Sequence, residues 1–349
     1  MAPIAPMPRT TLLRTLTVVV VGLLLIALFF FVGQRKRLFR ESRTSLYTLV
    51  TITVVSPSET KAREAMDAAY DELERVGRLL NFYAPDSELS RINRNAGVAP
   101  VKVSTETLGV IQKAVDAAEE TEGGFDVTVG PLVRLWDFKE KKVPSRESID
   151  AVRGLIGFRH IVINVGASTV YLDKKGVQID LGGIIKGYAA DRAAAVLEEY
   201  GIRDGIVAVA GDIRLFGRQP DGRPWNIGIQ HPRSADDDTA LLATLHLDGG
   251  AISTSGDYQR YFFADGVRYH HLLNPKTGFP QDLCRSVTVV APSAAATDAF
   301  ATGIFILGPQ KGIAALERLG MDGVIVDKDG AVLMTKGIRD KVKLVVAAP

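Results

Sequence analysis

The chain has little cysteine and almost no imbalance of charge. Among its 349 residues there is one cysteine, Cys284, and 42 basic side chains stand against 40 acidic ones, for a formal net charge of +2. A single cysteine excludes an internal disulfide, a cysteine-based zinc site and an N-terminal lipoprotein cysteine, and a small buried thiol is its simplest role. The balanced charge, without a basic aromatic stripe, argues against nucleic acid as a partner.

Two phosphate-binding signatures, G-x-x-x-x-G-K-[ST] and G-x-G-x-x-G, are also missing. The nearest feature is the segment Val177–Asp191, which predicts a short strand, a break at Gly182-Gly183 and a helix over 189–200. Such a turn brings backbone N–H groups and a helix N-terminus close to an anion, with Asp180 and Lys186 beside them. By itself, the segment is more typical of an ordinary solvated turn with surface charges.

A second segment supplies oxygen ligands. The sequence Ala296–Thr302 is typical of a helix start, where Asp298 and Thr302 project from one face because they are four residues apart. A carboxylate and a hydroxyl suit Mg²⁺, with water and a substrate phosphate completing its shell. Taken alone, the pair is more simply explained as helix caps. Together with the Gly-Gly-Lys turn, it indicates half of a site for a metal and a pyrophosphate.

The N-terminal region is apolar. Residues 16–33 carry no charge and are rich in Val, Leu and Phe, close to the minimum for a helix that spans a bilayer. A secretory signal is the alternative, but no small-x-small cleavage site follows. We therefore expect a tail at 1–15, an uncleaved transmembrane anchor at 16–33 and a basic linker at 34–45. The basic residues after the apolar run outnumber those before it, which favours a cytoplasmic domain.

The remainder, residues 46–349, is expected to form one domain. Periodic apolar residues predict helices over 59–80, 105–121, 297–307 and 309–319, and residues 81–95 are expected to form a loop. Hairpin-like strands fill most of the remaining sequence from 161 onward. Such runs of strands, interrupted by a few helices, predict an α+β fold with mainly antiparallel sheets and packed helices.

Six short motifs give the chain a resemblance to the ApbE family of FAD:protein FMN transferases. The resemblance covers roughly residues 46–345, and it implies an ApbE-like (T-fold-like) architecture. Each motif is weak alone, but six in the family's order are specific. They are Asp86–Asn93, Gly124–Asp126, Asp180–Gly187, Ser253–Tyr258, His271–Gly278 and Ala296–Thr302.

The resemblance implies transfer of FMN from FAD to a Thr or Ser of a partner flavoprotein, through a phosphoester bond, with Mg²⁺ required and AMP released. It assigns the magnesium to Asp298, Thr302 and the backbone carbonyl of Gly183, with Ala301 nearby. His271 matches the histidine that the family needs for transfer. The flavin contacts that it implies are Leu46, Tyr83, Gly124, Phe125, Asp126, Asp180, Lys186 and Leu272.

These assignments are chemically reasonable. The charge of a pyrophosphate must be neutralised before a hydroxyl oxygen can approach phosphorus, and Mg²⁺ with Lys186 would do this. A hydroxyl is a poor nucleophile, and a histidine can take its proton at neutral pH. Tyr83 and Phe125 offer apolar faces for a flavin ring. The simpler alternatives are a strand histidine at His271 and a loop anchor at Tyr83.

Three positions depart from the family pattern, and the smallest change is Ala210-Gly211-Asp212, where the family has Gly-Gly-Asp or Gly-Gly-Asn. Leu46-Tyr47-Thr48 stands where Met-Gly-Thr is common, so Tyr47 is expected to crowd a place of close backbone approach. Asn274 replaces the usual Asp, which removes a charge near His271 and could lower its basicity. The changes at Leu46-Tyr47 and Asn274 keep open the hypothesis of an FAD-binding protein without transferase activity. A third hypothesis is an FAD pyrophosphate hydrolase, which would use the same metal with water as the nucleophile and release FMN and AMP.

The expected partners are FAD, the membrane and an acceptor flavoprotein. The acceptor would carry a motif of the type Ser/Thr-Gly-Ala-Thr/Ser and would be a membrane redox subunit. Flanking charge favours the cytoplasm, whereas most relatives with such an N-terminal segment work outside the inner membrane. We follow the family here and expect a single-pass anchor in a bacterial inner membrane, with a periplasmic catalytic domain.

Overall fold

The computed structural model describes Thr17, residues 35–233 and residues 240–345. Its centre is an eight-stranded sheet in which each strand pairs antiparallel with its neighbours. In spatial order these strands are β1 (Arg37–Ser45), β2 (Thr48–Ser56), β6 (Gly205–Val209), β7 (Asp212–Phe216), β10 (Gly250–Gly256), β13 (Cys284–Ala291), β14 (Asp322–Asp327) and β15 (Val332–Met334).

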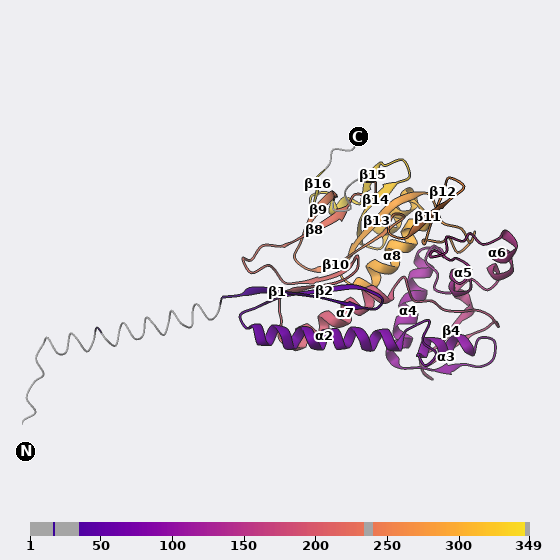
Figure 1. The fold of residues 1–349 in the computed structure, drawn as a ribbon, viewed down its shortest axis with the longest axis horizontal. Helices are drawn as coiled ribbons and strands as arrows, with labels where there is room; N and C mark the ends of the chain where they lie inside the picture. Colours follow the sequence, from indigo (N-terminus) through magenta and orange to yellow (C-terminus); the bar gives the residue numbers. More distant parts are fainter. Residues whose placement is uncertain (1–16, 18–34, 234–239, 346–349) are drawn as a thin grey trace, which may run out of the picture.

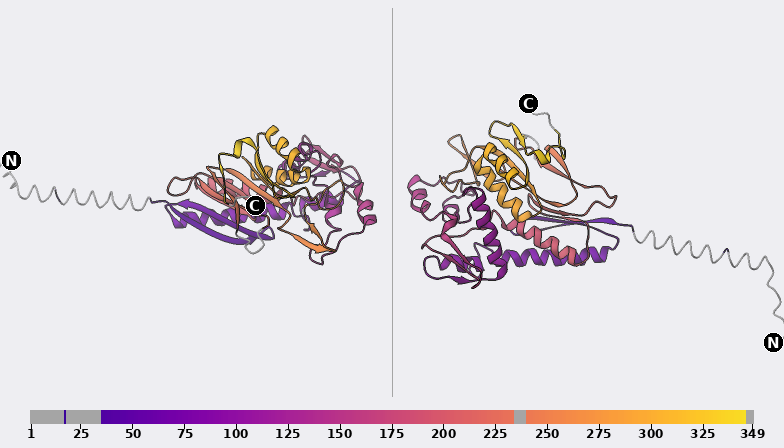
Figure 2. Two further views of the ribbon diagram at one scale, coloured as in Figure 1. Left: turned by 90° about the horizontal axis from the view of Figure 1, so that it is seen from above. Right: turned by 180° about the vertical axis from the view of Figure 1, so that it is seen from behind.

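Helices cover one face of this sheet. Figures 1 and 2 show α2 lying along α7, with α4 across one end of the pair and α8 against the middle of the sheet. Buried alanines on α2 and α7, such as Ala65 and Ala193, let the two backbones approach closely. The helices of this layer are α2 (Glu59–Leu79), α4 (Thr105–Glu120), α7 (Ile185–Glu199), α8 (Ala294–Leu307) and α9 (Pro309–Arg318).

A small sheet covers the opposite face. Trp225 and Leu245 from this sheet pack with Leu215 and Ile252 of the large sheet in a second core, separate from the helical one. Two apolar layers therefore sandwich the central strands, which explains why β13 and β14 are buried along most of their length. The covering strands are β8 (Trp225–Gln230), β9 (Leu241–Leu247) and β16 (Val342–Leu344).

The remaining elements lie around the end of α4 and at the edge of the domain. A hairpin of β11 (Tyr261–Ala264) and β12 (Val267–His270) packs on an aromatic cluster that includes Trp136 and Phe279. The other elements are α3 (Glu88–Arg94), β3 (Val101–Lys102), α5 (Gly130–Val133), α6 (Arg146–Arg153), a 3₁₀ turn at Phe158–His160, β4 (Ile161–Asn164), β5 (Thr169–Leu172) and a 3₁₀ turn at Lys336–Ile338.

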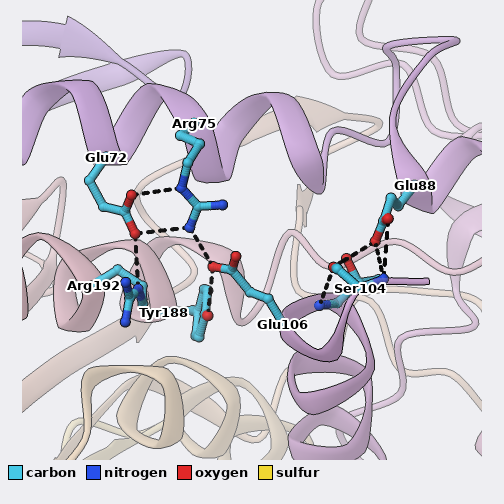
Figure 3. A network of polar contacts seen from close by, with 8 residues as sticks. Glu72, Arg75, Glu88, Ser104, Glu106, Tyr188 and Arg192 are labelled. Carbon is cyan, nitrogen blue, oxygen red and sulfur yellow. Dashed lines mark hydrogen bonds and ion pairs between the residues drawn. The ribbon is translucent and has the colours of Figure 1, made fainter. Parts of the chain in front are cut away.

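A charged network joins three helices (Figure 3). Glu72 of α2 accepts hydrogen bonds from Arg75 (2.7 Å) and from Arg192 of α7 (2.9 Å). Glu106 of α4 accepts from the same Arg75 (2.7 Å) and from the Tyr188 hydroxyl (2.8 Å). The arginines hold the pKa values of both glutamates below their ordinary range. Two carboxylates are thus matched by two guanidinium groups.

The structure confirms the α+β class and the helices predicted from apolar periodicity. Cys284 is buried as expected, and burial raises the pKa of its thiol to about 12. Two local predictions were wrong. Residues 81–95 were expected to be a loop, yet they contain α3, which Ser87 caps by accepting from Ser90 N. The helix predicted over 189–200 begins at Ile185 instead, so Lys186 lies in its first turn.

The linker predicted at 34–45 was also wrong, because Arg37–Ser45 forms β1 and pairs with β2 along its whole length. Its sequence, RLFRESRTS, lacks a strand's apolar alternation because β1 is an edge strand, where charged side chains are typical. The folded domain therefore begins before residue 46. Apart from Thr17, the predicted anchor at 16–33 lies outside the described residues, and among those described no helix is long and apolar enough to cross a membrane.

Candidate active site

Residues from all six motifs line one cleft of about 1100 Å³. It lies where the β1–β2 turn, the end of α2, the segment 124–129, the start of α7 and the residues after β12 meet. Of the predicted site residues, Ala301 alone does not line it, being buried within α8. Those that line the cleft are Leu46, Tyr83, Gly124, Phe125, Asp126, Asp180, Gly183, Lys186, His271, Leu272, Asp298 and Thr302.

Lys186 stands between two buried carboxylates in the cleft. Its ammonium group forms ion pairs with Asp212 and, at 3.4 Å, with Asp298. The second Asp298 oxygen accepts a hydrogen bond from Gly187 N at 3.0 Å. Burial raises the pKa of Asp298 to about 7, the nearby Asp212 adds to the rise, and Lys186 opposes it. Burial alone would lower the pKa of Lys186, but the two carboxylates together hold it above its usual range. Two acidic groups thus share one cation.

Asp298 is free for this role because other residues cap its helix. The N-cap of α8 is Ser293, whose hydroxyl accepts from Ala296 N. Asp191 of α7 accepts from Ala294 N (2.9 Å), Ala295 N (3.0 Å) and the Ser293 hydroxyl (2.7 Å). The interpretation of Asp298 and Thr302 as caps is therefore excluded, since Asp298 is buried one turn further along.

The residues predicted to hold a metal lie together. Thr302 shares the cleft-facing side of α8 with Asp298, and its hydroxyl lies 3.2 Å from that of Ser255. A Cβ at Gly183 would stand 3.7 Å from the Thr302 hydroxyl, so the Gly183 backbone lies beside it. A carboxylate, a hydroxyl and a carbonyl are hard oxygen donors that fit Mg²⁺. Among the described residues no cluster of three or more His, Cys, Asp or Glu could hold a metal, so this site would need oxygens from its ligand.

The turn before α7 offers fewer free backbone donors than expected. The N–H of Gly182 donates to Asp180 at 2.8 Å, and those of Ile184 and Ile185 donate to the Leu181 carbonyl. Burial raises the pKa of Asp180. The motif therefore shapes the wall of the cleft and places Lys186, and it is not an open anion nest.

His271 follows directly after β12. Its backbone N–H and its ring Nδ1 both lie within hydrogen-bonding distance of the Arg260 carbonyl, at 3.1 and 3.3 Å. A carbonyl can only accept, so Nδ1 carries the proton and Nε2 is left as a base. Burial, followed by the neighbouring His270, lowers the pKa of His271 to about 4. His270 itself is structural, because it donates to the Gln281 carbonyl and accepts from Leu272 N.

The walls of the cleft are partly aromatic. Phe125 is buried beside Gly183, whereas Tyr83 is 68% exposed and touches Phe82 edge to face. Leu272 is buried. Asp126 is committed to its own segment, since it accepts from Thr128 and from Phe158 N, and burial raises its pKa. Asp126 therefore holds the wall in shape.

Three residues have roles that the sequence did not assign. Asp212 and Ser255 belong to motifs that the sequence shows, Ala210-Gly211-Asp212 and Ser253–Tyr258, but their neighbours in space come from α7 and α8. Asn274 was expected to influence His271. Its amide instead donates to Gln281 at 2.9 Å and accepts from Lys276 N, so it builds the turn that follows.

These features define an α+β protein with a large cleft that combines aromatic walls, a neutral imidazole and oxygen donors for a cation. The sequence profile of the ApbE family matches residues 46–325. The FAD:protein FMN transferase of Escherichia coli K12 is 34% identical over 277 residues, which are 77% of this chain and 78% of that protein. For the enzyme of the same name from Vibrio cholerae, the identity is 40% over 250 residues, or 70% and 74%.

Solved structures agree with this match. The ApbE protein of Thermotoga maritima superposes with a TM-score of 0.81 and 34% identity, covering 87% of this chain and 99% of that one. The flavin transferase ApbE of Vibrio cholerae gives 0.77 and 33%, covering 88% and 99%. The chain belongs to the ApbE family, as the six motifs indicated.

Proposed function

We propose that this chain is an FAD:protein FMN transferase that requires Mg²⁺ and attaches FMN to a Thr or Ser of an acceptor flavoprotein. The observation that carries the proposal is the meeting of His271, Lys186, Asp298 and Thr302 around one cleft, although they are far apart in the sequence. A protein that only binds FAD would not need a neutral histidine next to a site for a metal and a pyrophosphate. The names of the relatives support the same activity.

Asp298, Thr302 and the Gly183 carbonyl would hold the metal. When bound there, Mg²⁺ would neutralise charge on the pyrophosphate of FAD. Lys186, which already neutralises part of the negative charge, would turn from the carboxylates toward a phosphate oxygen. Phe125 and Tyr83 would contact the flavin ring, and Asp126 and Asp180 would keep the walls of the cleft in shape.

His271 would act as the general base. In the reaction, the acceptor hydroxyl oxygen forms a bond to the phosphorus of the FMN half, the bond from that phosphorus to the AMP half breaks, and AMP leaves. The hydroxyl proton passes to His271 Nε2, which is the free nitrogen because Nδ1 donates to Arg260. An imidazole whose lowered pKa keeps it neutral at pH 7 is in the right form for this step.

An intact-mass experiment tests the proposal. The chain, FAD and Mg²⁺ are mixed with an acceptor domain carrying a Ser/Thr-Gly-Ala-Thr motif, with a matched acceptor whose terminal Thr is Val. Gain of one FMN by the first acceptor alone, abolished by EDTA, is the expected result. FAD that stays bound with no transfer would instead support the binding-protein hypothesis, and FMN and AMP formed without an acceptor would support hydrolysis.

The site of action is part of the proposal. We propose that residues 16–33 anchor the chain in a bacterial inner membrane, with the catalytic domain in the periplasm and a membrane redox subunit as the acceptor. The apolar run at 16–33 supports the anchor, and the location of most relatives with such an N-terminal segment supports the periplasmic orientation. The basic residues that flank the run favour the opposite orientation. A C-terminal fusion to a reporter that is active only in the periplasm should show activity. Activity of a cytoplasmic reporter instead would reject the orientation.

A further inference from the structure

The hairpin β11–β12 is joined to the cleft at both of its open ends. Arg260 precedes β11 and His271 follows β12, and both residues line the cleft. Their backbones are paired, since His271 N donates a hydrogen bond to the Arg260 carbonyl at 3.1 Å. Figure 1 shows the hairpin at the edge of the domain. The hairpin therefore extends the protein surface outward from the proposed general base.

One face of the hairpin is buried and the other carries exposed aromatic rings. Phe262 is buried and packs against Phe138, with 5.6 Å between the ring centroids. Tyr261 and Phe263 project from the opposite face, because side chains alternate along a strand, and they are 42% and 58% exposed. Their rings meet edge to face at 5.7 Å. Tyrosine and phenylalanine are enriched at protein–protein interfaces, and here they give the fold little buried contact.

Arg268 lies on the same exposed face, opposite Phe263 in the ladder. Its guanidinium carbon is 4.0 Å from the ring centroid of Tyr261 and 5.1 Å from that of Phe263. Its Nη1 is buried and has no hydrogen-bond partner in the described part of the chain. A covered donor without a partner is unfavourable. Because a guanidinium group pairs best with a carboxylate, this arginine favours a partner molecule that supplies one.

The charge around the hairpin also favours an acidic partner. Within residues 259–276 the basic side chains are Arg260, Arg268 and Lys276, and the acidic one is Asp265 at the tip of the hairpin. None of these four side chains forms an ion pair with another residue that the structure describes. The positive charge of this surface is therefore not neutralised within the described fold.

The outer edge of β11 is open. Arg260 and His271 form a hydrogen-bonded pair, and such pairs alternate in an antiparallel ladder, so the N–H and C=O groups of Tyr261 and Phe263 point away from β12. The two strands form a sheet of their own, and no backbone hydrogen bond joins these outward groups to the rest of residues 35–233 and 240–345. An open edge of this kind can accept an extended segment as a third strand.

We propose that the β11–β12 hairpin is the docking surface for the acceptor flavoprotein, and that an extended acidic segment of the acceptor pairs with the outer edge of β11. This inference rests on the proposed function. A carboxylate of the segment pairs with Arg268, and its apolar side chains contact Tyr261 and Phe263. Because three residues of a strand span about 10 Å, a segment paired at Phe263 extends to Arg260, where its Thr or Ser enters the cleft beside His271.

Acceptor kinetics test the inference. Phe263→Ser and Arg268→Gln should each raise the KM for the acceptor about tenfold, with kcat and FAD affinity unchanged, because they remove contacts made only with the acceptor. The full chain is assayed with FAD, Mg²⁺ and increasing concentrations of the acceptor domain that carries the Ser/Thr-Gly-Ala-Thr motif. Transfer is followed by intact mass, and FAD affinity by flavin fluorescence without acceptor.

Two substitutions outside the hairpin are the matched controls. Arg159 also lies over an aromatic ring, 5.2 Å from the centroid of Phe158, and Tyr200 is also exposed, but neither lines the cleft. Arg159→Gln and Tyr200→Ser should leave the acceptor KM unchanged.

The expected acidity of the partner is tested by changing the acceptor. Acidic residues that flank the motif are compared with Asn or Gln at the same places. The unaltered chain should prefer the acidic acceptor about tenfold in kcat/KM, and Arg268→Gln should lose this preference. Equal kcat/KM values for both acceptors with the unaltered chain would reject the acidic partner.

Hydrogen exchange tests the strand pairing with an acceptor whose terminal Thr is Val. Exchange of the Tyr261 and Phe263 N–H groups should slow when this acceptor binds, whereas that of Phe262, whose N–H faces β12, should not change. Equal exchange at Tyr261 and Phe263 with and without acceptor would reject the added strand.

The outcomes separate this inference from the proposed function. An unchanged acceptor KM in both Phe263→Ser and Arg268→Gln overturns the docking surface while leaving the transferase intact. Weakened FAD binding in both variants also overturns it, because the hairpin would then only support the cleft. Failure of the unaltered chain to transfer FMN to any acceptor rejects the proposed function itself.

Discussion

Two clusters in this protein use the same side-chain chemistry for different purposes. Between the helices, Glu72 and Glu106 are matched by Arg75 and Arg192, and Tyr188 donates one more hydrogen bond. In the cleft, Asp212 and Asp298 share the single cation Lys186. The first cluster is balanced in charge, and the second has one carboxylate more than it has cations.

The pKa values reflect this difference. Arginine lowers the pKa of both glutamates in the network, whereas burial raises that of Asp298. A balanced network contributes to stability and needs no further partner. An acidic excess inside a cleft is costly unless a cation joins it, which is why the cleft fits a metal and the network does not. Substitutions in each cluster test this difference between the cleft and the network.

Asp298→Asn should have the largest effect. The amide keeps the shape of the side chain but removes the charge that would hold Mg²⁺, so FMN transfer should fall about 10³-fold. The measurement is the initial rate at saturating FAD and Mg²⁺, with circular dichroism as a check on folding. Glu72→Gln, outside the cleft, is the matched control and should keep its rate. Near-normal transfer by Asp298→Asn would mean that the cleft cluster is only structural.

His271→Gln should reduce transfer about 10²–10⁴-fold, as for loss of a general base. Because burial lowers the pKa of His271 to about 4, the imidazole is neutral above that value. At saturating Mg²⁺, which favours the ionised form of Asp298, the kcat/KM of the unaltered chain should thus stay level from pH 8 to about pH 5 and fall as protonation of His271 begins below that. His246→Gln, at an exposed position of β9, is the control. A fall already centred near pH 6.5 would contradict a desolvated base.

Lys186→Gln should test directly whether the cleft has an excess of negative charge. Without the lysine, two buried carboxylates lose their cation, so we expect a stability loss of about 3 kcal/mol. Added Mg²⁺ should then raise Tm more in this variant than in the unaltered chain, because the metal can replace the missing charge. Thermal denaturation with and without Mg²⁺ measures both effects, and Ca²⁺ tests size selectivity. An equal Mg²⁺ response in both proteins would argue that the metal binds elsewhere.

Glu106→Gln should have the smallest effect, a loss of about 1 kcal/mol with transfer unchanged, because the pair is partly exposed. Arg75 keeps the pKa of Glu106 below 4.5, so the ion pair is fully formed above that pH and weakens as the pH falls through the lowered value. Urea denaturation at pH 7 and pH 3.5 should show a larger difference between the two proteins at pH 7 than at pH 3.5. A loss of transfer in Glu106→Gln would show that the network also supports the site.

Much of the fold was predictable because it depends on local patterns. The apolar stripe of α2 and its Ser58 cap are readable in the sequence, as are the Gly and Pro residues that end helices. The strand β1 and the helix α3 were missed for the same reason, since both carry charged residues that reveal no buried face. Their structure depends on pairing with β2 and on packing against neighbours far away in the sequence.

The sequence by itself determined the family and the chemical inventory, because six ordered motifs name the residues even when nothing is known of their positions. Only the tertiary structure decided which charges meet. Lys186, Asp212 and Asp298 come from α7, β7 and α8, and their pKa values depend on burial and on distances that no local pattern encodes.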